Sequence, residues 1–188
     1  FFMENQKITD ESEKGYSSQQ RSIMKVAIVG VGNILLKDEG IGVKVVKELE
    51  NEFSFPSDVA LIDGGTAGHH LINMISDFDV LIVVDAVQGG EPPGTIYKYA
   101  FDQIPIEVHT HLTVHQVGVL EALNQVKLLG KEQKITFIGI EPQDISPWGM
   151  ELTPVIADKI PKLITLVLEE LKECGMASCR VVPKTEHN

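Results

Sequence analysis

The chain has 188 residues, which is enough for one well-buried domain and too few for two of ordinary size. Its 27 acidic and 16 basic residues give a formal net charge of −11, which disfavours nucleic acid and anionic membrane surfaces as partners. No apolar run reaches the roughly 18 to 20 residues that cross a bilayer, and residues 1–22 lack the apolar centre of a signal peptide. We therefore expect a cytoplasmic protein with no nucleic-acid or membrane partner.

Three segments are expected along the chain. Residues 1–23 are polar and show no sustained hydrophobic period, so we expect a disordered extension there. A single α/β domain is expected over residues 24–174, followed by a flexible tail over residues 175–188. Cys174 and Cys179 are the only cysteines, so neither a disulfide framework nor a four-cysteine zinc site can be built.

Short apolar runs alternate with helical patterns from residue 25 onward. The expected strands lie at residues 26–29, 59–62, 80–84, 95–99 and 135–140, and the expected helices at 39–52, 67–76, 115–129 and 152–173. This alternation favours a mostly parallel sheet with helices on both faces. The run at 95–99 alternates polar and apolar residues after a Pro-Pro-Gly sequence, which is typical of an edge strand.

The first strand leads into the turn Gly30-Val31-Gly32, and Asp38 and Glu39 begin the helix that follows. The turn is similar to a dinucleotide-binding fingerprint, but that fingerprint needs a third glycine where this chain has Leu35. A nucleotide-dependent oxidoreductase or transferase therefore stays an alternative. Acids in a first helical turn also suit the helix dipole, so the pair indicates either a capped helix or a metal or catalytic carboxylate.

Acidic residues follow each of the first three strands. Glu39 follows the first, Asp63 the second, and Asp85 comes directly after the third. Because the carboxyl ends of parallel strands share one edge of a sheet, we expect these acids to converge there. Asp85 ends an apolar run, where a carboxylate is desolvated unless it pairs, binds a metal or caps the next turn. Asp63 also suits ordinary turn chemistry, so we assign it a secondary role beside the site.

His115 stands at the start of the helix expected over residues 115–129, where its ring can face the same edge as Asp85. Imidazole with two carboxylates suits a divalent metal such as nickel or zinc, although a histidine at a helix start is also an ordinary surface residue. A non-catalytic metal-binding assembly factor would use the same residues. His109 and His111 could join His115 in a histidine cluster or lie in a solvated loop, and their role stays open. The long loop around Trp148 could close over the site, contact a partner or serve simple packing.

Four motifs in this order resemble the hydrogenase maturation endopeptidases. They are the stretch from Gly30 to Gly42, Asp63-Gly64-Gly65-Thr66, Val84-Asp85-Ala86 and His115-Gln116-Val117-Gly118. The resemblance implies a three-layer α/β/α fold with a mostly parallel five-stranded sheet whose fourth strand is antiparallel. It also implies an aspartyl-type endopeptidase that removes the C-terminal extension of a nickel-iron hydrogenase large-subunit precursor after nickel insertion.

The resemblance also implies roles for individual residues. Glu39, Asp85 and His115 match the residues that recognise nickel, and Glu39, Asp85 and Asp63 are the catalytic candidates. The nickel is expected to arrive on the precursor, which is the expected partner, and the enzyme is expected to act as a monomer. Asp38 is left with the ordinary task of starting a helix.

Overall fold

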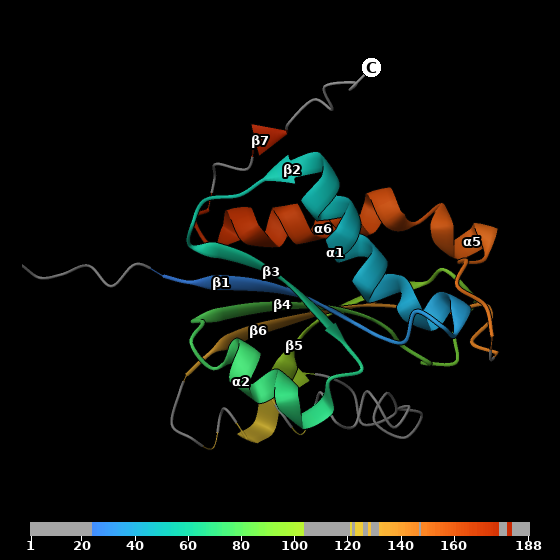
Figure 1. Ribbon diagram of the computed structural model, residues 1–188, viewed down its shortest axis with the longest axis horizontal. Coiled ribbons are helices and arrows are strands. Elements are labelled where there is room, and N and C mark those ends of the chain that lie inside the picture. Colours follow the sequence, from blue (N-terminus) through green and yellow to red (C-terminus); the bar gives the residue numbers. More distant parts are fainter. Residues whose placement is uncertain are drawn as a thin grey trace, which may run out of the picture.

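The computed structural model describes residues 24–103, 132–146, 148–176 and 180–181, together with residues 121, 123–125 and 128. In chain order its elements are β1 (Val26–Val31), the 3-10 helix η1 (Lys37–Gly40), α1 (Ile41–Glu52), β2 (Phe53–Ser54), β3 (Val59–Gly65), the 3-10 helix η2 (Gly68–His70), α2 (Leu71–Ile75), β4 (Val80–Ala86), β5 (Ile96–Ala100), the 3-10 helix η3 (Phe101–Gln103), β6 (Lys134–Ile140), α5 (Pro154–Ala157), α6 (Ile160–Glu173) and β7 (Arg180–Val181). Figure 1 shows their arrangement.

A five-stranded sheet with the order β3-β1-β4-β6-β5 forms the centre of the fold. The pairs β1 with β3, β1 with β4, and β4 with β6 are parallel, whereas β5 runs antiparallel to β6. The predicted sheet is thus confirmed, because its fourth strand in chain order is the antiparallel one and lies at an edge. A separate antiparallel pair, β2 with β7, was not expected from the sequence.

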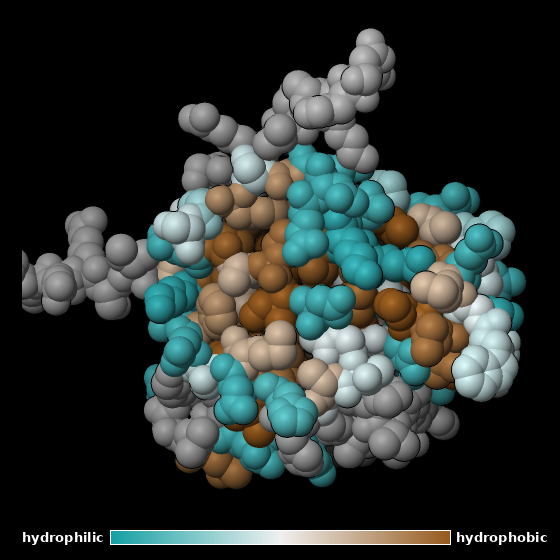
Figure 2. All heavy atoms as spheres, viewed as in Figure 1, coloured by the Kyte–Doolittle hydropathy of each residue, from teal (hydrophilic) through white to brown (hydrophobic). Residues whose placement is uncertain are grey.

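Helices cover both faces of the sheet, as predicted (Figure 1). On one face α1 and α6 pack against alternate residues of β4, among them Ile82 and Val84. On the other face Leu71 and Ile75 of α2 pack against Leu81 and Val83. Each large apolar side chain that is fully buried contributes about 1.5–3 kcal/mol, so these two cores hold the layers together. Figure 2 shows the outer surface of α1 as a hydrophilic band, as expected for an amphipathic helix.

The helices differ in their limits from the predicted ranges. The helix predicted over residues 152–173 is divided into α5 and α6, and Pro161 lies in the first turn of α6, where its missing N–H breaks no helical hydrogen bond. The described residues 121, 123–125 and 128 are helical and lie within the helix predicted over 115–129. In the part of the chain that the structure describes, no helix is long and apolar enough to cross a membrane.

Candidate active site

Glycines bring the start of α1 against the sheet. A Cβ atom at Gly42 would lie 2.1 Å from the carbonyl oxygen of Val84, and one at Gly30 would lie 2.2 Å from the carbonyl oxygen of Gly42. Gly32 has φ +125°, and a Cβ atom there would meet the carbonyl oxygen of Glu39 at 1.7 Å. Any side chain at these positions would push the helix away. The glycine turn therefore serves close packing, and it brings Glu39 to the carboxyl edge of the sheet.

Glu39 is buried without full compensation. Its side chain belongs to η1 and the residue is 4% exposed. The Oε2 atom has no hydrogen-bond partner among the described residues. Because leaving a buried polar atom unpaired costs about 1–3 kcal/mol, such an atom calls for an explanation, and a ligand that binds there is a physical one.

Asp85 is the second buried acid at this edge. It lies near the end of β4, is 1% exposed, and its Oδ1 atom accepts a hydrogen bond of 2.8 Å from the N–H of Ala86. Since side chains alternate along a strand, Asp85 projects to the same side as Val83, toward the face that α2 covers. The segment η1 contacts β4, so two buried carboxylates from distant parts of the sequence are brought to one edge.

Asp63 lies at the same carboxyl edge of the sheet, but its side chain projects from the face opposite to that of Asp85. It is exposed, and it stands in register with Gly30, which in turn pairs with Val84. Asp63 therefore shares the side of Val84, whereas Asp85 comes one residue later and projects to the opposite face. The end of β3 is tied to the glycine turn by the N–H of Gly32, which donates to the carbonyl oxygen of Gly65 at 3.0 Å.

The predicted third ligand, His115, lies outside the described residues, as do His109 and His111. Within the described residues, no group of three or more His, Cys, Asp or Glu side chains could hold a metal ion. The oxygens of Glu39 and Asp85 supply two hard donors, and an imidazole would complete a set that suits a divalent metal. The donors that are described thus fit the predicted chemistry.

Asp38 lies in the first turn of η1, at the start of the helical segment as predicted, but its side chain also has a role that the sequence did not predict. It is fully buried, and its carboxylate makes no helix cap. The carboxylate instead accepts hydrogen bonds from the N–H groups of Gln143 and Asp144 at 3.0 and 2.8 Å, and from the N–H and hydroxyl of Thr153 at 2.7 and 2.9 Å. Asp38 therefore also anchors the loop between β6 and α5, a role that the sequence did not predict.

Glu141 is a buried acid that the sequence analysis missed. Its carboxylate accepts hydrogen bonds from the N–H groups of Gly89 and Gly90 at 2.7 and 3.2 Å and from the Tyr97 hydroxyl at 2.6 Å. Burial, together with the Glu141 carboxylate, raises the pKa of Tyr97. The sequence did contain a sign of this buried acid, because Glu141 follows an apolar run just as Asp85 does. With its partners in place, Glu141 holds the loop after β4 and is structural.

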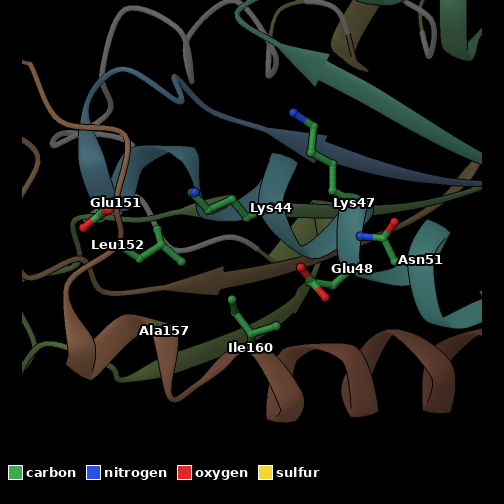
Figure 3. Close-up of a pocket in the computed structure, with 8 residues that line it drawn as sticks. All are labelled: Lys44, Lys47, Glu48, Asn51, Glu151, Leu152, Ala157 and Ile160. Carbon is green, nitrogen blue, oxygen red and sulfur yellow. The ribbon is translucent and has the colours of Figure 1, made fainter. Parts of the chain in front are cut away.

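A surface pocket lies apart from these acids. It has a volume of about 430 Å³ and is lined by residues of α1, the loop before α5, the end of α5 and the start of α6 (Figure 3). The lining residues are Lys44, Lys47, Glu48, Asn51, Glu151, Leu152, Ala157 and Ile160. None of them is a predicted site residue, and their charges are mixed. The pocket therefore adds nothing to the assignment of the active site.

The profile of the hydrogenase maturation proteases matches residues 43–170 of this chain. The chain belongs to the hydrogenase maturation protease family. The match includes Asp63 and Asp85 and begins just after Glu39. Membership confirms the resemblance drawn from the motifs, and it identifies the chain as a hydrolase that acts on peptide bonds. A nucleotide-dependent oxidoreductase and a non-catalytic assembly factor lose their support.

Known proteins are similar to this maturation protease over most of its length. The hydrogenase expression/formation protein HupD of Bradyrhizobium diazoefficiens is 37% identical over 166 residues, covering 87% of this chain and 85% of the relative. The hydrogenase 2 maturation protease of Escherichia coli is 34% identical over 155 residues, covering 81% of this chain and 94% of the relative. The solved structure of the hydrogenase maturating endopeptidase HybD from E. coli superposes with a TM-score of 0.77 at 32% identity, covering 87% of this chain and all of that one.

Proposed function

We propose that this maturation protease removes a C-terminal extension from the large-subunit precursor of a nickel-iron hydrogenase after nickel has been inserted. Glu39, Asp85 and His115 bind the nickel that the precursor carries. The observation that carries the proposal is the Oε2 atom of Glu39, which is buried without a described partner at the same edge as the buried Asp85. A cation that arrives with the substrate offsets the cost of burying these carboxylates.

The proposed site separates recognition from proton transfer. A divalent metal can polarise a peptide carbonyl or a water molecule, and the precursor brings that metal only when it is ready for cleavage. With Glu39 and Asp85 engaged at the nickel, the exposed Asp63 is the acid at this edge that is left to accept a proton from the attacking water. That proton then goes to the leaving amine. The cytoplasmic location and the monomeric state stay predictions from the sequence.

Mass spectrometry of a nickel-loaded precursor incubated with the enzyme tests the proposal. We expect loss of a C-terminal peptide, no cleavage of the nickel-free precursor, and a loss of at least about 100-fold in rate for Glu39→Ala, Asp85→Ala and His115→Ala. Asp63→Asn should lower kcat by a similar factor without weakening nickel retention in the complex.

Glu50→Ala is the matched control, because Glu50 is an exposed acid on α1. It should cleave at the wild-type rate. Full activity of the Glu39, Asp85 or His115 variants, or equal cleavage of nickel-free precursor, would contradict the proposed function.

A further inference from the structure

Three large apolar side chains are exposed where two loops meet. Leu35 is 46% exposed, Trp148 86% and Met150 58%. We call these three residues the Trp148 patch. Single exposed apolar residues are normal on a protein surface, but neighbouring ones from two separate segments are typical of an interaction site.

The backbone holds this patch in place. Leu36 and Gly149 form a parallel β-bridge. The N–H of Lys37 donates to the carbonyl oxygen of Gly149 at 2.7 Å, and the N–H of Gly149 donates to the carbonyl oxygen of Leu35 at 3.1 Å. Leu35 and Trp148 each precede one partner of the bridge, and Met150 follows it. The Lys37 ammonium group is also ion-paired with Asp144. The patch is therefore fixed by hydrogen bonds between its two segments.

The backbone beside this bridge is strained at two residues. Trp148 has φ +70° and Lys37 has φ +51°, which are left-handed conformations that cost a residue other than glycine about 1–3 kcal/mol. These are the two positive-φ residues other than glycine in the described part of the chain, and both lie beside the bridge. A backbone that keeps a tryptophan exposed at such a cost is consistent with a use for that exposure.

Hydrogen bonds link the segments of the patch to the candidate active site. The N–H of Glu39 donates to the carbonyl oxygen of Leu36 at 3.1 Å, so the segment that carries Leu35 also positions the proposed nickel ligand. On the other segment, the Asp38 carboxylate holds Asp144 and Thr153, which lie on either side of Trp148 in the sequence. A protein whose peptide bond approaches Glu39 would therefore come near the segment that carries Leu35.

We propose that the Trp148 patch is the docking surface for the hydrogenase large-subunit precursor, and that Trp148 inserts into an apolar depression on that protein. This inference rests on the proposed function. Tryptophan is enriched among the residues that dominate binding energy at protein interfaces, and large apolar side chains form the dry centre of such contacts. The net charge of −11 disfavours an anionic membrane as the occupant.

Kinetics and binding with the full-length chain test the inference. Trp148→Ala should raise the Kd for the precursor about 30-fold and raise KM similarly, with kcat unchanged, because the patch contributes to docking and not to the chemical step. Leu35→Ser combined with Met150→Ser should act in the same direction. Leu128→Ser is the matched control, since Leu128 is also 86% exposed but lies on another segment, and it should change neither Kd nor KM.

The outcomes separate this inference from the proposed function. If the wild-type chain cleaves the precursor and Trp148→Ala leaves Kd and KM at the values of the Leu128→Ser control, the docking surface is wrong while the function stands. If the wild-type chain does not cleave, the function fails, and the Kd comparison still decides docking. Trp148-dependent sedimentation with phosphatidylglycerol vesicles, with unchanged precursor affinity, would overturn the inference in favour of a membrane surface.

Discussion

Asp38 and Thr153 are joined by two hydrogen bonds although 115 residues separate them in the sequence. The carboxylate accepts from the N–H of Thr153 at 2.7 Å and from its hydroxyl at 2.9 Å. The next residue, Glu39, has a carboxylate oxygen with no partner among the described residues. Two adjacent acids thus have different surroundings: the Asp38 carboxylate is fully hydrogen-bonded to a loop, and the Glu39 carboxylate has one oxygen without a partner among the described residues.

Removal of the Asp38 carboxylate should destabilise the protein. Asp38→Ala leaves three N–H groups of the loop without their acceptor, and hydrogen bonds to a charged group contribute about 1.5–3 kcal/mol each before solvent replaces them. We expect the free energy of unfolding to fall by about 3 kcal/mol, measured by urea denaturation. Asp102→Ala removes an exposed acid and should stay within about 0.5 kcal/mol of wild type. Equal stabilities for the two variants would contradict the anchoring role.

Glu39 and Glu141 should respond in opposite ways to the same substitution. Glu39→Gln removes a buried charge that lacks full compensation, so we expect an unchanged or higher Tm together with loss of cleavage. Glu141→Gln weakens hydrogen bonds from Gly89 and Tyr97 and should cost about 1–2 kcal/mol. Thermal unfolding of both variants is the measurement, and a Glu39→Gln protein as unstable as Glu141→Gln would count against a binding role for Glu39.

Gly42 tests the close packing of α1 on the sheet. Alanine favours a helix over glycine by about 1 kcal/mol, but a methyl group here would lie 2.1 Å from the carbonyl oxygen of Val84. The clash is with backbone, which cannot move aside cheaply, so we expect Gly42→Ala to destabilise by about 2–3 kcal/mol and to reduce cleavage by displacing Glu39. Lys47→Ala, at an exposed position of the same helix, should change stability by a few tenths of a kcal/mol. Denaturation of the two variants compares these effects.

The ion pairs of the buried Glu170 carboxylate of α6 with Lys98 and Lys134 should make stability depend on pH. The carboxylate of Glu170 is bound by Lys98 at 2.7 Å, Thr136 at 2.9 Å and Lys134 at 3.1 Å. Burial opposes ionisation of Glu170, but the hydrogen bonds from Lys98, Thr136 and Lys134 together outweigh it and lower its pKa below the usual 4.5. In acid the unfolded chain therefore takes up this proton before the folded one does.

The contribution of Glu170 is consequently complete above about pH 4.5 and is lost as the pH falls through the lower folded-state pKa. Glu170→Gln should be about 1–3 kcal/mol less stable than wild type at pH 7, with the difference shrinking below pH 4.5. Urea denaturation across this range measures it. Glu169→Gln, an exposed neighbour on α6, serves as the control, and a constant difference at all pH values would refute the assignment.

The sequence by itself determined what depends on local pattern. Four apolar runs became strands of the sheet, and the alternating run at 95–99 became its fifth strand, the antiparallel edge strand β5. Four ordered motifs indicated the family. Asp85 was also placed correctly in the fold, because an acid that directly follows a buried parallel strand must lie at the carboxyl edge of the sheet. These features need only the period of a strand or helix and the spacing of residues.

The tertiary structure alone decided how the acids divide their roles. Asp38 and Glu39 are neighbours with the same chemistry, and nothing local distinguishes them. The partners of Asp38 lie more than 100 residues away, at Gln143, Asp144 and Thr153. The register of β1 with β3 and β4, which places Asp63 and Asp85 on opposite faces, is likewise a property of strand pairing. Which of the two carboxylates is hydrogen-bonded depends on donors that distant segments bring, and only folding brings these donors to the acid.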